Sequence, residues 1–424
     1  MGTGLRLPAR YRSSPVDRIP IDEAVRILAA GSVDLISEAE LRTKLARERP
    51  MRVKLGIDPT ASDIHLGFAV VLRKLRQFQD LGHTAVLILG DFTAQVGDPS
   101  GRSATRPRLT AEQVEAHLES YQAQAGLVLR SDRLEVRRNS EWLGKLGVEG
   151  MLRLTGSATV AQILERDDFQ KRWRAGQPIS VTELLYPLLQ GWDSVEVEAD
   201  VELGGSDQLF NNLMGRELQA KEGQEPQVVL TTPLLEGLDG VQKMSKSLGN
   251  YVGITEPPAE QFGKLMSIPD KLLPRYFALA TGWGPDRVEA EVGALNEGRT
   301  HPVEAKRRLA RTIVDLYHGE GAGQAAEEEF NRVFRSHQAP ADVPTFVLEP
   351  DHLVDGRIRL FRLLALTGLV PSNSEGRRKI AEGAVRLDGD RLTDPEADLA
   401  PDEVDGRLLQ VGRRAWVRVV AGQR

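Results

Sequence analysis

Two segments that lie far apart in the sequence carry side chains suited to binding phosphate. Residues 65–68 read His-Leu-Gly-Phe and stand where a loop enters an expected helix. The free amides of a helix N-terminus favour anions, Gly67 lets a ligand approach the backbone, and His65 adds a side-chain donor. A histidine that only caps the helix is the alternative interpretation.

The second segment, residues 243–247, reads Lys-Met-Ser-Lys-Ser and follows a segment with two glycines. Ammonium groups stabilise charge that develops on phosphate, so Lys243 and Lys246 suit a loop that closes on a polyphosphate. The apolar Met244 between them favours a loop that docks and undocks. A solvated basic loop is the alternative.

A helix and a glycine turn could line a pocket for a polar ligand. Tyr186, Gln190 and Asp193 recur at helical spacing among leucines, so they share one helix face, which alternatively only meets water. Residues 204–208 read Gly-Gly-Ser-Asp-Gln. The carboxylate of this turn suits a ribose diol and its amide suits a ligand carboxylate, unless it is a plain Gly-Gly turn.

A further loop carries both acidic and basic side chains. Residues 97–103 read Gly-Asp-Pro-Ser-Gly-Arg-Ser after an apolar strand. Asp98 could bind an ammonium group, while Arg102 and Arg106 could reach phosphate. An Asp-Pro turn with surface arginines is the alternative.

The composition argues against several other kinds of site. The 424 residues include no cysteine, which excludes a disulfide scaffold, a thiol nucleophile and a cysteine zinc site, and suits a reducing compartment. The seven histidines lie too far apart to predict a metal site. Without a run of 18 apolar residues, no transmembrane helix is expected, and residues 1–20 are interpreted as a loose arm.

The elements that must position these side chains alternate over the first part of the chain. Helical spacing recurs over residues 22–49, 67–79, 110–129 and 150–194, and strand-like runs occupy 51–57, 85–89, 134–138, 201–204 and 228–230. This order predicts a doubly wound parallel α/β sheet with a helical insertion. Ligands bind beyond the carboxyl ends of such strands.

The rest of the chain changes character twice. Residues 258–336 are helical in pattern, and the proline-containing segment 338–350 is interpreted as a linker. From Gly356, helices are predicted over 357–366 and 374–382, with strands over 385–390 and 416–419. The net charge of −6 divides into −9 before Gly356 and +3 after it, which suits a nucleic-acid partner that touches selected patches.

Together these motifs resemble those of class I aminoacyl-tRNA synthetases, and the chain is similar to the tyrosyl-tRNA synthetase family over nearly its whole length. Residues 65–67 and 243–247 match the paired ATP motifs. Residues 56–60 (Gly-Ile-Asp-Pro-Thr), 97–101 and 204–208 are specific in combination with the Tyr186 helix. The KMSKS loop and the Lys-Leu-Gly strand look like one of two bacterial branches.

The resemblance implies that tyrosine is activated by ATP to tyrosyl-adenylate and then transferred to tRNA, through positioning and electrostatics. The residues that it assigns to catalysis are His65, Lys243, Lys246, Arg102 and Arg106. Those assigned to ATP are Asp58, Thr60, His65, Gly67, Gly205, Asp207, Lys243, Lys246 and Ser247. Those assigned to tyrosine are Gly56, Asp98, Tyr186, Gln190, Asp193 and Gln208, with Asp193 accepting the phenol hydroxyl. Mg²⁺ is expected with ATP as a substrate complex, without a protein metal site or a tightly bound cofactor.

Two positions depart from the family pattern. Phe68 stands where many class I enzymes have His or Asn, which removes one contact to the nucleotide. Lys54 stands where the other bacterial branch carries a tyrosine beside the substrate phenol, which leaves Asp193 to recognise the hydroxyl more alone.

The resemblance also implies domains and partners. The expected domains are a catalytic domain over 1–240, with the arm 1–20 and a dimer-interface insertion at about 140–190; the KMSKS loop and an α-helical anticodon-binding domain over 241–340; a linker over 341–355; and an S-four-type RNA-binding domain over 356–424. A cytoplasmic homodimer that binds tRNA(Tyr) across its subunits, with no membrane contact, is expected.

Three alternatives remain at this point. A tryptophan–tRNA ligase shares the architecture, although residues 204–208 and Asp193 favour tyrosine. A non-catalytic RNA-binding paralogue would not need the intact lysines or His65. Other nucleotidyltransferases with the first motif lack the C-terminal RNA module.

Overall fold

The computed structural model describes residues 19–59, 63–99, 111–334, 343–412 and 415–422. The chain divides into two compact units, Met1–Gly323 and Gln324–Arg424. The expected N-terminal arm, residues 1–20, lies outside the described residues except for its last two. Within the described ranges, no helix combines the length and the apolar character that a bilayer span requires.

A six-stranded sheet forms the centre of the first unit. Its strands are β1 (Asp34–Ile36), β2 (Arg52–Ile57), β3 (Thr84–Leu89), β4 (Leu134–Arg138), β5 (Val201–Gly205) and β6 (Val228–Thr232). Their order is β1-β6-β5-β2-β3-β4, in which β2 to β6 are parallel and β1 is antiparallel to β6. The five parallel strands are the predicted ones, so the doubly wound α/β fold is confirmed.

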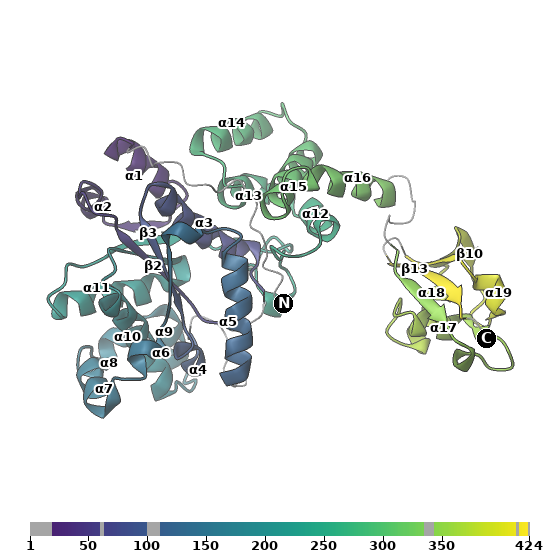
Figure 1. The fold of residues 1–424 in the computed structure, drawn as a ribbon, viewed down its shortest axis with the longest axis horizontal. Helices are drawn as coiled ribbons and strands as arrows, with labels where there is room; N and C mark the ends of the chain where they lie inside the picture. The colour runs from purple at the N-terminus through teal and green to yellow at the C-terminus, as the bar shows by residue number, and fades with distance from the viewer. Residues whose placement is uncertain (1–18, 60–62, 100–110, 335–342, 413–414, 423–424) are drawn as a thin grey trace. The chain divides into compact units, whose positions relative to one another are not determined.

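Helices cover both faces of this sheet (Figure 1). The crossovers from β2 to β3 and from β5 to β6 run in opposite directions across the sheet, and right-handed crossovers then place their helices on opposite faces. One face carries α3 (Leu66–Asp80), followed by α5 (Ala111–Ala125). The other carries α11 (Leu209–Lys221), against which α10 (Val181–Glu196) packs. The buried apolar run of β3 fits a strand covered on both sides.

The predicted helical insertion over residues 150–194 contains three short helices before α10, namely α7 (Gly147–Thr155), α8 (Val160–Ile163) and α9 (Asp167–Arg174). Two further short helices, α4 (Thr93–Val96) and α6 (Ser140–Leu143), lie before this range and were not predicted. Leu154 and Phe169 of this insertion are buried in one apolar cluster with Leu188 and Trp192 of α10. This cluster fixes the insertion to α10, the helix that carries three predicted site residues.

The predicted helical run over residues 22–49 is wrong in its middle. Two helices, α1 (Ile21–Ala29) and α2 (Glu38–Leu45), flank β1. A capping box starts α2, because Ser37 Oγ accepts from the Glu40 amide and the Glu40 carboxylate accepts from the Ser37 amide. A three-residue edge strand has too few residues to show a period of its own, so only its pairing with distant β6 reveals it.

The predicted all-helical segment after residue 258 is confirmed. Its helices are α12 (Pro258–Met266), α13 (Leu273–Ala280), α14 (Pro285–Asn296), α15 (Pro302–His318) and α16 (Ala322–Phe334), the last of which crosses into the second unit. Within the first unit, α13 contacts α3. The helical segment therefore packs against the same helix whose N-terminus carries His65.

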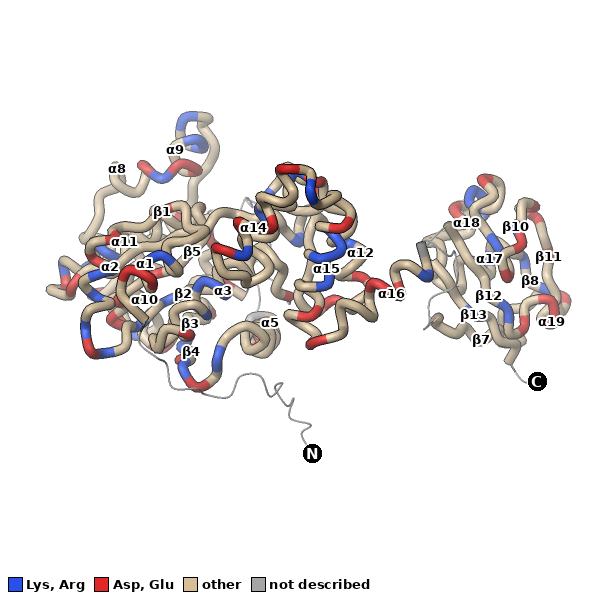
Figure 2. The backbone as a smooth tube through the Cα atoms, turned by 90° about the horizontal axis from the view of Figure 1, so that it is seen from above, with Lys and Arg blue, Asp and Glu red and all other residues tan. Residues whose placement is uncertain are grey.

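The second unit is a small α+β domain. Its elements are β7 (Thr345–Leu348), β8 (Ile358–Arg359), α17 (Leu360–Leu366), α18 (Asn373–Ala381), β9 (Val385–Leu387), β10 (Asp390–Leu392), β11 (Asp398–Leu399), α19 (Pro401–Val404), β12 (Leu408–Val411) and β13 (Ala415–Ala421). Five strands form a sheet in the order β10-β9-β12-β13-β7. Both acidic and basic residues occur along this unit (Figure 2).

The expected linker over 341–355 is wrong for residues 345–348. These residues form β7, which pairs in parallel with β13 at the edge of the sheet. Pro344 and Pro350 flank the strand, and prolines are tolerated at strand ends and edges. The prolines therefore bound an edge strand that belongs to the C-terminal unit.

The close approach of α10 and α11 gives a stability prediction. A Cβ on Gly191 would lie 2.8 Å from Leu218 Cδ1 and 3.2 Å from the Gly215 amide nitrogen. Gly191→Ala should therefore lower the free energy of unfolding by about 1–3 kcal/mol, as overpacking does. The matched control is Gly263→Ala in α12, where a Cβ meets no atom within 4 Å. That variant should gain up to about 1 kcal/mol, because alanine favours a helix. Equal effects in denaturant unfolding followed by circular dichroism would contradict this packing.

Candidate active site

The carboxyl ends of β2 and β5 leave an opening in the sheet. These strands are parallel neighbours, and their crossovers depart to opposite sides. Gly56, near the end of β2, is exposed although its neighbours Leu55 and Ile57 are buried, and a Cβ there would meet no atom within 4 Å. A ligand can therefore lie over the backbone of β2 at this point, where Gly56 was predicted.

Tyr186 meets Asp58 at this opening. The Tyr186 hydroxyl donates to Asp58 Oδ2 at 2.9 Å, and Thr93 Oγ1 donates to Oδ1 at 2.7 Å. Gly90 makes the second bond possible, because a Cβ there would lie 2.1 Å from Asp58 Oδ1. The structure thus groups Asp58, which the resemblance assigns to ATP, with a residue assigned to tyrosine.

Burial controls the ionisation of this pair. Burial raises the pKa of Asp58 to about 7, with nearby Asp98 and Asp193 adding to the rise and the bonds from Thr93 and Tyr186 opposing it. Burial also holds the pKa of Tyr186 well above its usual value. Tyr186 therefore keeps its proton and acts as a donor to Asp58.

The amide and carboxylate side chains predicted to hold the amino acid are joined by two residues outside the motifs. Asn211 donates to Gln190 Oε1 at 2.9 Å and to Gln208 Oε1 at 3.0 Å. Gln208 donates to Asp98 Oδ2 at 2.8 Å, and buried Arg166 bonds both Asp98 Oδ1, at 3.2 Å, and Asn211 Oδ1, at 3.0 Å. Four segments that lie far apart in the sequence therefore form one polar cluster.

Asp193 lies deeper in the same helix face and is 3% exposed. Trp142 Nε1 donates to its Oδ1 at 2.8 Å, and Asn139 Nδ2 donates to its Oδ2 at 3.3 Å. Burial raises the pKa of Asp193 to about 7, while Lys54 and these two donors oppose the rise. The result is a buried, oriented acceptor with lone pairs left for a ligand hydroxyl.

Residues 65–68 stand at the start of α3 as predicted, and His65 also caps the helix, as the alternative interpretation has it. His65 is the N-cap, and its Nδ1 accepts from the Phe68 amide at 3.2 Å. Burial, aided by Lys246 and Lys243, lowers the pKa of His65 to about 4, so the ring is neutral at pH 7. Because Nδ1 accepts, the proton is on Nε2, which leaves Nε2–H as a donor.

The loop of residues 243–247 is docked on the start of α3. Buried Met244 places its Sδ 3.3 Å from the amide of Gly67, and a Cβ on Gly67 would lie 3.2 Å from Met244 Cβ. Glycine at position 67 therefore allows this contact. Asn250 supports the loop from behind, since its Oδ1 accepts from the Ser245 amide at 2.8 Å and its Nδ2 donates to the Lys243 carbonyl at 3.2 Å.

The two lysines of the loop reach different partners. Lys243 forms an ion pair with Asp207 at 3.0 Å, next to Gly205 in the predicted turn. Lys246 Nζ lies 5.8 Å from the ring centroid of Tyr121 in α5, and burial lowers its pKa. Ser247 Oγ lies 2.9 Å from Ser245 Oγ within the loop.

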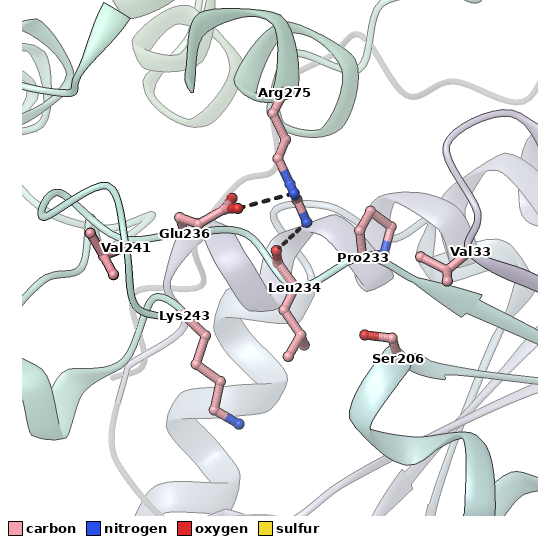
Figure 3. A pocket seen from close by; sticks show the side chains of 8 residues that line it. All are labelled: Val33, Ser206, Pro233, Leu234, Glu236, Val241, Lys243 and Arg275. Atoms are coloured by element: carbon pink, nitrogen blue, oxygen red, sulfur yellow. Dashed lines mark hydrogen bonds and ion pairs between the residues drawn. The ribbon is translucent and has the colours of Figure 1, made fainter. Parts of the chain in front are cut away.

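A cavity of about 330 Å³ opens beside Lys243. Lys243 and Ser206 line it, and Arg275 from α13 reaches down to Glu236 and the Leu234 carbonyl at its rim (Figure 3). The loop of residues 243–247, the Gly-Gly turn and the helical segment thus all contribute side chains to the wall of this cavity.

Three predicted residues, Thr60, Arg102 and Arg106, lie outside the described residues. The other predicted side chains gather at the carboxyl end of the sheet. Residues that the sequence analysis did not single out also contribute, namely Asn139, Trp142, Arg166, Asn211 and Asn250. Only Asn211 had a usable signal, because it follows Gln208 by three positions and so shares its side of α11.

Comparisons with known proteins show the family to which the chain belongs. Residues 46–335 match the family model described as tRNA synthetases class I (W and Y), and residues 336–416 match the tyrosine–tRNA ligase SYY-like C-terminal domain. The tyrosine–tRNA ligase of Moorella thermoacetica is 50% identical over 93% of this chain and 95% of its own length. That of Deinococcus radiodurans is 48% identical over 95% of this chain and 97% of its own length.

Solved structures share the fold. A C-terminally truncated mitochondrial tyrosyl-tRNA synthetase from Aspergillus nidulans aligns with a TM-score of 0.61 at 22% identity, over 74% of this chain and 94% of that one. A tyrosyl-tRNA synthetase from Archaeoglobus fulgidus, complexed with L-tyrosine, aligns with a TM-score of 0.60 at 23% identity, over 72% of this chain and 99% of that one.

The buried carboxyl of Asp58 gives a pH-dependent stability prediction. Its pKa is about 7 in the folded chain and 3.8 as the ordinary value, so ionisation destabilises the fold as the pH rises through this window. Asp58→Asn removes that cost, and its stability relative to the unmodified protein should increase by about 2–3 kcal/mol from pH 5 to pH 8. Denaturant unfolding at the two pH values measures this; a difference that is the same at both would contradict it.

Proposed function

Because the chain belongs to the class I tRNA synthetases of the tryptophan and tyrosine group and has the activity of a tyrosine–tRNA ligase, we propose how its side chains divide the work. Tyrosine, ATP and tRNA are its substrates. The observation that carries the assignment of residues to tyrosine is the buried carboxylate of Asp193, oriented by Trp142 and Asn139.

The polar cluster at the carboxyl end of the sheet holds tyrosine. Asp193 accepts the phenol hydroxyl, so phenylalanine would leave a buried acceptor unpaired. Tyr186, Asp98 and Gln190 grip the α-ammonium group, and Gln208 lies at the carboxylate end. Exposed Gly56 leaves room for the substrate above β2.

The two phosphate motifs hold ATP. Asp207 binds the ribose and Lys243 the phosphates, so their mutual ion pair must open when the nucleotide enters. That exchange costs little, because Lys243 is 46% exposed and such pairs are worth at most about 1 kcal/mol. Neutral His65 offers Nε2–H and Lys246 its ammonium group to the leaving pyrophosphate. Gly67, Gly205 and Ser247 bind through backbone and hydroxyl, and Thr60, Arg102 and Arg106 keep the roles given by the resemblance.

The reaction itself needs no covalent enzyme intermediate. A carboxylate oxygen of tyrosine forms a bond to the α-phosphorus while the bond to the bridging oxygen of pyrophosphate breaks. The negative charge that leaves with pyrophosphate is met by the two lysines, which is stabilisation by fixed, oriented charge. A ribose hydroxyl of the terminal tRNA nucleotide then takes the tyrosyl group and releases AMP.

Mg²⁺ enters as part of the ATP complex. The side chains at the phosphate end are two ammonium groups and a histidine whose Nδ1 is already used as an acceptor, a set that does not coordinate a hard cation. Phosphate oxygens and water are therefore its ligands.

The helical segment α12–α15 faces the anticodon side of tRNA, and the C-terminal unit is an S-four-type RNA-binding domain. The match of residues 336–416 to a tyrosine–tRNA ligase C-terminal domain supports the second assignment. On α18, Arg377, Arg378 and Lys379 supply cations, although Glu375, Glu382 and Glu396 pair with them. ATP and tRNA as substrates support a cytoplasmic location.

The enzyme acts as a homodimer through the insertion at about 140–190. Several large apolar side chains of this insertion and the start of α10 are exposed, namely Val148, Leu152, Val160, Trp173 and Val181. Val148 and Leu152 lie one helical turn apart on α7. Such a concentration of exposed apolar groups favours burial against a second copy.

Tyrosine-dependent ATP–pyrophosphate exchange tests the function and two of the roles. The unmodified enzyme should exchange with tyrosine and not with tryptophan or phenylalanine. Lys246→Ala should lower kcat at least about 100-fold with little change in the KM for tyrosine, because it acts on the leaving group. Asp193→Ala should raise the KM for tyrosine far more than the KM for ATP.

The matched control is Lys271→Ala in the helical segment, outside every contact described for the site, which should behave as the unmodified enzyme does. Exchange with tryptophan in place of tyrosine would overturn the amino-acid assignment. An unchanged KM for tyrosine in Asp193→Ala would overturn the role of that carboxylate.

Placing charged side chains at the proposed interface tests the dimer proposal. Val148→Glu combined with Leu152→Glu should halve the mass measured by light scattering, because burying two carboxylates at an interface is costly. The control is Val354→Glu, at a position 60% exposed in the C-terminal unit, which should leave the mass unchanged. A double variant that keeps the mass of the unmodified protein would place the interface elsewhere.

A further inference from the structure

We propose that Lys54 is a positioning residue for tyrosine recognition: paired with Glu202 beneath Gln190 and Asp193, it fixes Gln190 and favours the charged form of Asp193. This proposal rests on the proposed function, in which Gln190 and Asp193 touch the amino acid. Lys54 itself contacts neither the substrate nor the reacting atoms.

Lys54 is completely enclosed. Its side chain is 0% exposed and that of Glu202 is 1% exposed, with Nζ 2.9 Å from Glu202 Oε1. Nζ also donates to Ser194 Oγ at 2.7 Å and to the Gln190 carbonyl at 2.8 Å. The ammonium therefore ties β2 and β5 to the middle of α10, and all three of its protons have acceptors.

Glu202 also holds the side chain of Gln190. Gln190 Nε2 donates to Glu202 Oε1 at 3.3 Å, and Ser194 Oγ lies 3.0 Å from Oε2. Gln227 Nε2 donates to the same Oε2. Gln190 is thus held at its backbone carbonyl by Lys54 and at its amide by Glu202, which leaves its orientation in the pocket fixed.

A buried ion pair of this kind is a weak source of stability. The desolvation of two charges offsets most of their attraction, and uncharged replacements of similar volume are often as stable. The pair lies directly below Gln190 and Asp193. We therefore expect it to affect tyrosine binding more than the free energy of unfolding.

The electrostatic effect on Asp193 has a definite sign. Burial raises the pKa of Asp193, and Lys54 is the largest influence that lowers it. The charged groups facing Asp193 are Lys54 from β2, Glu202 from β5 and Asp58 from the loop after β2, with Tyr186 on its own helix. Without Lys54, the only cation of this set is lost, and the ionised fraction of Asp193 at neutral pH falls.

A protonated Asp193 binds the phenol hydroxyl of tyrosine more weakly. Its remaining carbonyl oxygen is the weaker acceptor, because hydrogen bonds to a charged oxygen are roughly twice as strong. Its own proton would then compete for the phenol oxygen. Discrimination between tyrosine and phenylalanine should therefore fall with the ionised fraction of Asp193.

Three variants test the proposal in tyrosine-dependent pyrophosphate exchange between pH 5.5 and pH 8.5: Lys54→Met, Glu202→Gln, and the two combined. For each variant, the KM for tyrosine, the KM for ATP, kcat and the midpoint of denaturant unfolding are measured. The combined variant carries no unpaired charge, so it keeps the test valid if Lys54→Met alone does not fold.

We expect opposite shifts in the pH dependence. The pH below which the KM for tyrosine rises should move up by about one unit in Lys54→Met and down in Glu202→Gln. In the combined variant, it should move up by a smaller amount, because Lys54 has the larger influence. At pH 7, the combined variant should show an at least fivefold higher KM for tyrosine, with the KM for ATP within twofold and the unfolding midpoint unchanged.

A combined variant with the tyrosine KM and pH profile of the unmodified enzyme would overturn the proposal, and so would shifts of the same sign in both single variants. These outcomes are distinct from failure of the proposed function, which would appear as absence of tyrosine-dependent exchange in the unmodified enzyme.

Discussion

The reversal of strand order between β2 and β5 is the constraint on which the rest of the site depends. The crossovers that follow these neighbouring strands leave in opposite directions, so neither covers the point where both strands end. Gly56 and the Gly-Gly turn keep side chains out of this opening. Asp58 follows one strand and Asp207 the other, so residues far apart in the sequence meet because of topology alone.

Burying carboxylates at this point has a cost that the surrounding groups reduce but do not remove. Asp58 and Asp193 both have a pKa of about 7 because burial disfavours their charge. Neutral donors orient them, Tyr186 and Thr93 for the first and Trp142 and Asn139 for the second. Their acceptors are thus fixed before a ligand arrives, which spares the reorganisation that water would require.

Sequence patterns predicted the elements and motifs well and the contacts between them poorly. The strands of the parallel sheet were evident because continuous apolar runs reflect burial on both faces. β1 and β7 were missed because short edge strands depend on partners distant in the chain. Arg166 was missed for a related reason: it is a single polar residue, and only the folded chain places it between Asp98 and Asn211.

The contacts of Phe68, which departs from the family pattern, change the interpretation of the motif at residues 65–68. Its ring meets Tyr121 edge-on, with centroids 6.5 Å apart, and Lys246 lies 5.8 Å from the centroid of the Tyr121 ring. Phe68 therefore supports an aromatic surface for the loop lysine instead of offering a donor to the nucleotide. Among the described residues, Lys246 Nζ has no hydrogen-bond partner. A cation–π contact is worth about 0.5–2 kcal/mol, less than a charge-assisted bond to phosphate in the same place. The ring thus holds the ammonium close to the phosphate motif while leaving its three protons for the substrate.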